Sequence, residues 1–100
     1  MLDFFKSILG GGNKVNIQEI LDKGAVVIDV RTPQEYAAGH VKGSKNIPLN
    51  TISTNIEKIK AMNKPIILCC ASGMRSGQAT GILTKEGIEA YNAGSWQSLA

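Results

Sequence analysis

Two short runs of apolar residues carry almost no polar interruption, at positions 25–28 and 66–71. Such runs are typical of strands covered on both faces of a sheet, so we predict strands at 25–29 and 65–69. Pro65 stands at the entry of the second run, where a strand loses no ladder donor. Shorter segments predict two further strands, at 46–48 and 88–92.

Helix signals lie between these runs. The strongest is Thr32, which is followed by Pro33 at the first helical position and Glu35 at the third, a pattern that predicts a capped helix. Gly77 and Gly81 lie four residues apart, and we expect close packing against the sheet there. Because strands and helices alternate, the sequence predicts an α/β domain with a mainly parallel sheet. The other predicted helices cover residues 16–23, 52–62 and 76–85, with a final turn at 95–99.

The length and the N-terminal pattern predict one domain with an appended segment. The chain has 100 residues, 43% of them apolar, which is enough for one hydrophobic core but not for two domains. Residues 2–9 have apolar side chains at helical spacing and precede three glycines. We therefore predict an amphipathic segment and glycine linker at 1–12, docked on a domain at 13–100. No apolar run approaches the roughly 20 residues of a membrane span, and the first residues lack the basic region and cleavage site of a secretion signal.

The charges and the cysteines narrow the possible functions. The net charge is only +3, the basic residues are scattered, and aromatic residues make up 5% of the chain, so we expect no nucleic-acid binding. One histidine and two adjacent cysteines do not form a tetrahedral set, so no metal or other cofactor is expected. Cys69 and Cys70 cannot close a useful disulfide loop, which predicts free thiols and a cytoplasmic location. Cys69 ends a predicted strand and is expected to be an inert core residue.

Candidate chemistry follows the 65–69 strand, because ligands of open parallel sheets bind beyond the carboxyl ends of the strands. Residues 70–76 there read Cys-Ala-Ser-Gly-Met-Arg-Ser. If this segment curls into a loop before the helix, its backbone N–H groups converge on an anion, with Gly73 allowing the turn and Arg75 adding positive charge. A thiol of Cys70 at the mouth of this cradle should be acidic and nucleophilic.

Three segments together resemble the rhodanese (thiosulfate sulfurtransferase) family. The 70–76 loop is similar to that family's active-site loop, residues 27–48 to its N-terminal signature, and residues 92–96 to its glycine–tryptophan ending. The resemblance covers about residues 14–99 and implies a three-layer fold, with a central five-stranded, mainly parallel sheet flanked by helices. It also implies a single-domain sulfurtransferase. Sulfane sulfur from thiosulfate or a persulfide donor would pass through a Cys70 persulfide to a thiol, cyanide or protein acceptor.

The resemblance also implies roles for the residues around Cys70. Arg75 would anchor the loop and contribute charge, whereas Asp29 and Arg31 would support it from behind, as an ion pair. The residues expected to hold the donor's oxyanion and later the persulfide, mainly through backbone amides, are Ala71, Ser72, Gly73, Met74, Arg75 and Ser76.

Alternatives to a thiosulfate enzyme stay open at this stage. Ala71 stands where active thiosulfate enzymes of the family often have a basic residue, which favours a persulfide carrier or partner-binding module with little thiosulfate turnover. Related phosphatases and arsenate reductases have a loop one residue longer than the six residues here, so the spacing favours sulfur transfer. Elsewhere we interpret Glu35 as a helix cap, His40 as structural and Trp96 as a packing residue.

Overall fold

The computed structural model describes residues 16–100 and contains a four-stranded parallel sheet in the order β2-β1-β3-β4. The α/β class and the parallel sheet are confirmed. The expectation of five strands is wrong for the described residues. The hydrophobic pattern itself predicted four strands, and the fifth was implied by the resemblance alone. The strands are β1 (Val26–Asp29), β2 (Lys45–Asn46), β3 (Ile66–Cys70) and β4 (Ala90–Ser95).

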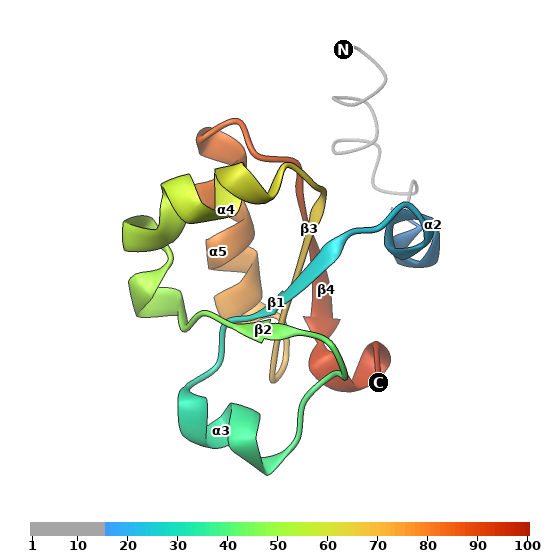
Figure 1. Cartoon of the computed structure of the whole chain (residues 1–100). Coiled ribbons are helices and arrows are strands. Elements are labelled where there is room, and N and C mark those ends of the chain that lie inside the picture. The colour runs from blue at the N-terminus through green and yellow to red at the C-terminus, as the bar shows by residue number, and fades with distance from the viewer. Residues whose placement is uncertain (1–15) are drawn as a thin grey trace.

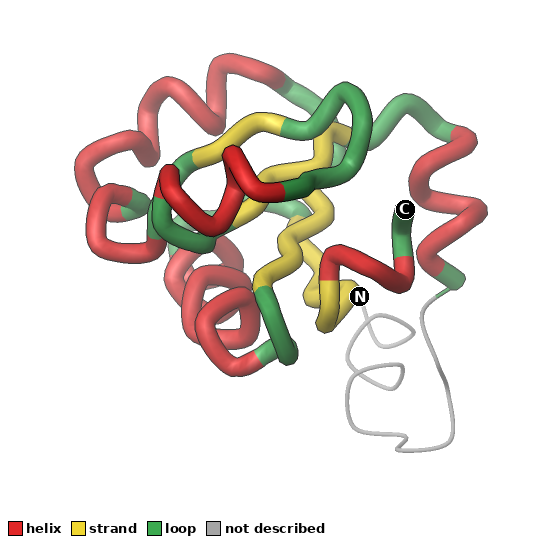
Figure 2. The backbone as a smooth tube through the Cα atoms, turned by 90° about the horizontal axis from the view of Figure 1, so that it is seen from below, coloured by secondary structure: helices red, strands yellow, loops and turns green. Residues whose placement is uncertain are grey.

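Helices flank the sheet on both sides. Helices α4 (Ile56–Met62) and α5 (Met74–Lys85) lie together on one side, and α2 (Ile17–Asp22) lies on the other (Figure 1). Figure 2 shows the strands between these two helical layers. Helix α3 (Pro33–Ala38) lies beyond the carboxyl ends of the strands. Short 3-10 turns complete the chain: η1 (Leu49–Thr51), η2 (Ser53–Asn55) and η3 (Trp96–Ser98).

Strand β3 forms the centre of the core. Its side chains alternate between the two faces of the sheet, as those of any strand do. Ile66, Leu68 and Cys70 pack into one cluster with residues of α4 and α5, whereas Ile67 and Cys69 point to the opposite face. All five are buried, which confirms the prediction of a strand covered on both sides. The two cysteines therefore lie in different environments although they are neighbours in the chain.

Local capping sets the starts of the helices. The Thr32 hydroxyl accepts from the Glu35 N–H at 3.2 Å, and the Glu35 carboxylate accepts from the Thr32 N–H at 2.9 Å, so the predicted capping box is confirmed. Asn16 caps α2 by accepting from the backbone of the third helical residue. Helix α5 begins at Met74 rather than at the predicted position 76, because Gly73, with φ +109°, is already its N-cap.

Strand β4 begins later than the predicted segment at 88–92. The N–H of Ile88 donates to the Leu83 carbonyl and that of Gly87 to the Thr84 carbonyl, both at 3.0 Å. These bonds finish helix α5, with Gly87 at φ +79°, so the backbone here serves the helix end instead of the sheet. The Ile88 side chain is nevertheless buried in the core, which is why it looked like part of a strand.

The predicted N-terminal segment at 1–12 lies outside the described residues, and its docking stays a prediction. Within residues 16–100, no helix is both long enough and apolar enough to cross a membrane.

Candidate active site

The predicted loop lies at the carboxyl edge of the sheet, next to α3 (Figure 1). Strand β3 ends at Cys70 and α5 begins at Met74, so residues 71–73 form a very short connection. Gly73 adopts φ +109°, a left-handed region that favours glycine. A Cβ atom at Gly73 would also lie 3.2 Å from the Cα of Gly94 in β4. Both the turn and its close approach to β4 therefore require glycine at this position.

The Sγ of Cys70 lies within a ring of hydrogen-bond donors. The backbone N–H groups of Gly73 and Ser76 donate to it at 3.0 and 3.4 Å, and the Ser76 hydroxyl at 3.3 Å. Burial raises the pKa of this thiol, but these hydrogen bonds, with one from the Ser72 backbone, outweigh burial and lower the pKa from 9.0 to about 7. Close to half of such a thiol is ionised at neutral pH.

The sulfur lies deeper than expected. We predicted a thiol at the mouth of the cradle, but Cys70 is only 1% exposed because its side chain belongs to the core cluster beneath α5. The side chains of the loop itself are open to solvent: Ala71 and Ser72 are exposed, and Met74 is 77% exposed. A donor must therefore pass the backbone of this loop to reach Sγ.

Cys69 has the opposite character. It is fully buried, and burial, with the neighbouring Asp29 carboxylate, raises the pKa of its thiol to about 12. The prediction that Cys69 is a buried core residue is confirmed, and its lack of reactivity stays a prediction. The strand end thus carries one acidic thiol and one that stays protonated near neutral pH.

Arg75 points from the first turn of α5 toward α3. Its guanidinium donates to both carboxylate oxygens of Glu35, at 2.8 and 3.0 Å. These two bonds, together with the N–H of Thr32, hold the pKa of Glu35 down at about 2. The sequence identified Glu35 only as a helix cap. Its contact with Arg75, 40 positions away in the chain, leaves no local sequence pattern. Arg75 therefore joins the first turn of α5 to α3, and a carboxylate matches its charge.

Asn92 is a residue of the site that the sequence did not reveal. Its Oδ1 accepts from the Ser76 hydroxyl at 2.7 Å and from the Gly94 N–H at 2.9 Å. Its Nδ2 donates to the Gly73 carbonyl at 3.0 Å. The one sequence signal related to Asn92 was Gly77. A Cβ atom at Gly77 would lie 3.3 Å from that Nδ2, so the close packing expected there is confirmed. Gly81 was grouped with it wrongly, since a Cβ atom there would contact nothing within 4 Å.

Asp29 and Arg31 form the expected ion pair at the end of β1. The closest contact joins Arg31 Nη2 to Asp29 Oδ2 at 2.7 Å, with the carboxylate fully buried. Arg31 also donates to the Gly39 carbonyl at 2.7 Å, and its guanidinium lies 4.7 Å from the centre of the Trp96 ring. The pair thus links the end of α3 to the C-terminal turn, and Trp96 packs as expected. The side chains of this pair bond to each other and to the Gly39 carbonyl, and none of these bonds reaches the Cys70 loop.

His40 is not placed for catalysis at Cys70. It is exposed, its ring stacks on Tyr36 with centroids 3.7 Å apart, and its Nδ1 lies 2.8 Å from the Tyr36 carbonyl oxygen. Among residues 16–100, no three His, Cys, Asp or Glu side chains form a group that could hold a metal ion.

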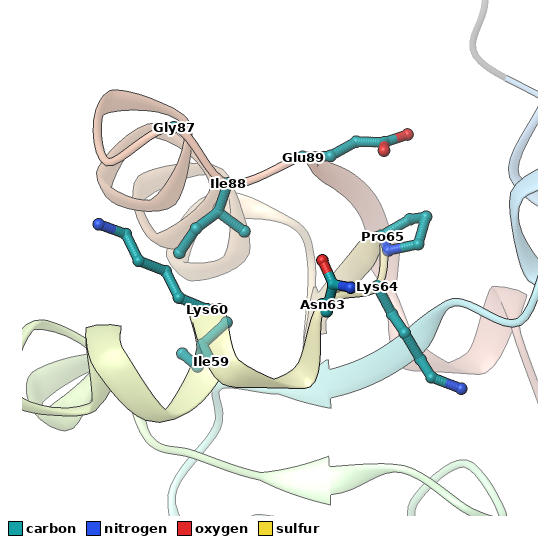
Figure 3. Close-up of a pocket in the computed structure, with 8 residues that line it drawn as sticks. All are labelled: Ile59, Lys60, Asn63, Lys64, Pro65, Gly87, Ile88 and Glu89. Atoms are coloured by element: carbon teal, nitrogen blue, oxygen red, sulfur yellow. The ribbon is translucent and has the colours of Figure 1, made fainter.

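A surface hollow of about 270 Å³ lies at the other edge of the sheet, where β3 and β4 begin (Figure 3). Its lysine at position 60 lies within 4.0 Å of Glu57 and 3.9 Å of Glu86. The hollow is thus separated from Cys70 by the length of β3. Its lining residues are Ile59, Lys60, Asn63, Lys64, Pro65, Gly87, Ile88 and Glu89.

Sequence comparison with known proteins identifies one family. The rhodanese-like domain model matches residues 14–99. An uncharacterized protein of Bacillus subtilis, YqhL, is 42% identical over 69 residues, which cover 68% of this chain and 54% of that protein. The thiosulfate sulfurtransferase PspE of Escherichia coli is 37% identical over 75 residues, 73% of this chain and 72% of that protein. The first matched relatives are longer: the chain covers just over half of the Bacillus protein and 64% of a Pseudomonas fluorescens thiosulfate sulfurtransferase, GlpE.

Solved structures agree with the sequence comparisons. A structure described as a rhodanese with anions from Escherichia coli superposes with a TM-score of 0.69 at 35% identity, covering 77% of this chain and 93% of that one. A human single-domain sulfurtransferase superposes with a TM-score of 0.67 at 29% identity, covering 81% and 86%. The chain belongs to the rhodanese-like domain family, and its α/β fold with a parallel sheet is the fold of the solved structures of that family.

Proposed function

We propose that this protein is a sulfurtransferase that carries sulfane sulfur on Cys70 as a persulfide. The observation that supports this most directly is the placement of the Cys70 sulfur among inward-facing N–H groups, which lower the pKa of its thiol to about 7. Relatives named thiosulfate sulfurtransferase make thiosulfate the first donor to test.

In the proposed first step, the Cys70 thiolate attacks the outer sulfur of thiosulfate. A sulfur–sulfur bond forms at Cys70, the sulfur–sulfur bond of thiosulfate breaks, and sulfite leaves with the electron pair. In the second step a thiophilic acceptor attacks the outer sulfur of the persulfide and regenerates the thiolate. With cyanide as acceptor the product is thiocyanate. The backbone amides between positions 71 and 76 are proposed to stabilise the anionic sulfur in each stage.

The loop would support these steps through its backbone more than through side-chain charge. Ala71 brings no cation, and the Arg75 guanidinium is paired with Glu35. Asp29 and Arg31 are proposed to support the loop indirectly, by fixing the end of β1 beside β3. Since the mechanism needs a reduced Cys70, we retain the cytoplasm as the proposed location.

The same observations favour a second candidate, a persulfide carrier that receives sulfur from another thiol persulfide and turns thiosulfate over slowly. Complementary charge raises the rate at which a charged ligand meets its site. A cradle without a free cation lacks this attraction and therefore captures a small dianion such as thiosulfate slowly. An organic or protein persulfide depends less on that attraction. The two candidates share Cys70 and differ in the donor.

Steady-state thiocyanate formation tests the proposal and separates the candidates. Thiosulfate and a small thiol persulfide are compared as donors, with cyanide as the acceptor. We expect turnover with at least one donor, its loss in Cys70→Ser and its retention in Cys69→Ser, the matched control. A kcat/KM that strongly favours the persulfide supports the carrier. No turnover with either donor, or hydrolysis of an aryl phosphate that depends on Cys70, contradicts sulfur transfer.

A further inference from the structure

The Ser76 hydroxyl faces two acceptors but has one proton. Cys70 Sγ lies 3.3 Å from its oxygen and Asn92 Oδ1 lies 2.7 Å from it. A hydroxyl donates one hydrogen bond at a time, while its lone pairs can accept others. Ser76 is fully buried, whereas Asn92 itself is exposed to solvent, and the hydroxyl has these two acceptors within hydrogen-bond reach. The two contacts therefore compete for the same proton.

The competing acceptor is held rigidly. The Gly94 N–H can only donate and the Gly73 carbonyl can only accept, so their bonds at 2.9 and 3.0 Å fix which end of the Asn92 amide is oxygen. Asn92 also stands beside a bulge. It pairs with Leu68 in β3, whereas Cys69 pairs with Gly94, which leaves one extra residue in β4. Its side chain thus points to the α5 face, where Gly77 leaves space for it.

We propose that Asn92 is a positioning residue that turns the Ser76 hydroxyl into a two-position switch. With Cys70 as a thiolate, the hydroxyl donates to Sγ. Once Sγ is neutral, either as a thiol or after it has gained a second sulfur that carries the charge, the hydroxyl donates to Asn92 Oδ1. The role in turnover rests on the proposed function, whereas the effect on the thiol does not.

The switch has a direct consequence for ionisation. A hydrogen bond that forms when the Cys70 sulfur is neutral and is lost when it is charged favours the neutral thiol over the thiolate. Asn92 therefore restrains the acidity that the loop gives to Cys70, and favours the stage at which the charge lies on the outer sulfur. A sulfur carrier gains from this arrangement, because its persulfide is kept instead of being returned to the donor.

The charged and titratable groups around Cys70 are few enough for the effect to be measured. On β3 the neighbour is Cys69, which stays protonated because its pKa is about 12. From β1, Asp29 faces Cys69 in the sheet register and is paired with Arg31. Arg75 of α5 is near Cys70, and its positive charge is paired with the Glu35 carboxylate of α3.

The experiment is a pH titration of the Cys70 thiolate by its ultraviolet absorbance, with Cys70→Ser subtracted. It needs neither a donor nor access of a reagent to the buried sulfur. We expect Ser76→Ala to lower the thiolate-to-thiol ratio about tenfold and Asn92→Ala to raise it about threefold, since one hydrogen bond is lost or freed. In the Ser76→Ala background, Asn92→Ala should have no effect. Asn55→Ala, which removes an amide bond to the Thr51 carbonyl and none to the Cys70 loop, is the matched control.

A purely structural role of Asn92 predicts a different pattern. Asn92→Ala would then lower the thiolate fraction, or shift it equally with and without the Ser76 hydroxyl, and either result overturns the switch. Asn92→Asp, which is nearly isosteric, is the second variant in case Asn92→Ala does not fold. With Ser76 present, it should lower the thiolate-to-thiol ratio at least tenfold, which raises the pKa of the Cys70 thiol. In the Ser76→Ala background, the rise in that pKa should be less than half as large. Equal shifts also overturn the switch. Because no sulfur is transferred, failure here is distinct from failure of the proposed function.

Discussion

Replacing Asp29 by asparagine removes the charge from the most deeply buried ion pair described in the structure. The asparagine side chain would keep an acceptor for the Arg31 backbone N–H, which now lies 3.0 Å from Oδ1, but its amide NH₂ would face the guanidinium. The carboxylate is fully buried and Arg31 is 5% exposed, so water cannot replace the lost charge. Removing one partner of a buried ion pair leaves the other charge buried without compensation, which costs about 3–5 kcal/mol. Because domains of this size have about 5–15 kcal/mol in total, the variant should lose roughly a fifth or more of its stability.

Urea unfolding followed by circular dichroism measures this loss, and a double-mutant cycle assigns it to the pair. Arg31→Met removes the cation, so Asp29→Asn/Arg31→Met should be more stable than the sum of the single changes predicts, by about 1.5 kcal/mol or more. A loss below about 1 kcal/mol in Asp29→Asn would refute the reasoning, as would strictly additive effects, because either result means that the charges are not coupled.

Three further predictions concern the loop. Gly73→Ala should cost about 1–3 kcal/mol in urea unfolding, because φ is +109° and the new Cβ meets the Gly94 backbone; an unchanged midpoint contradicts this geometry. Glu35→Gln should lose less stability than the wild type as pH falls from 4.5 through about 2, since the depressed pKa of Glu35 stabilises the fold only above that window; identical acid transitions contradict the Arg75 pairing. Single-turnover persulfide formation should rise with pH around a midpoint of about 7 and level off above it, and stability should rise between pH 7 and 9 in the wild type but not in Cys70→Ser, because the folded-state pKa of the Cys70 thiol lies below the ordinary value; a rate midpoint near 9 contradicts the donor ring.

Local patterns were sufficient for much of the fold. The apolar run that becomes β3 and the capping box at Thr32 each depend on neighbouring residues, so spacing alone predicted them. The starts of α5 and β4 were misplaced because they depend on where the chain turns left-handed, at Gly73 and Gly87. Sequence identifies a glycine but does not say which of its conformations the tertiary contacts select.

In the candidate site too, features set by neighbouring residues were predicted, whereas contacts from distant parts of the chain were missed. The order of Cys70, Gly73 and Arg75 predicted a loop whose amides turn toward the sulfur, because strand, loop and helix start follow one another directly in the chain. Glu35 and Asn92 come from other elements, and their contacts with the loop arise only when the chain folds. The depth of the sulfur was missed for a related reason: side chains alternate along β3, and position 70 shares the core face with Leu68.

Intact-mass analysis after incubation with a sulfane donor tests the central claim most directly. The protein is mixed with thiosulfate or a small thiol persulfide, freed of excess donor and weighed before and after cyanide. The account predicts one added sulfur atom, located on Cys70 by peptide mapping, removed by cyanide and absent from Cys70→Ser. A protein that gains no sulfur from either donor, or that gains it on Cys69, contradicts the account.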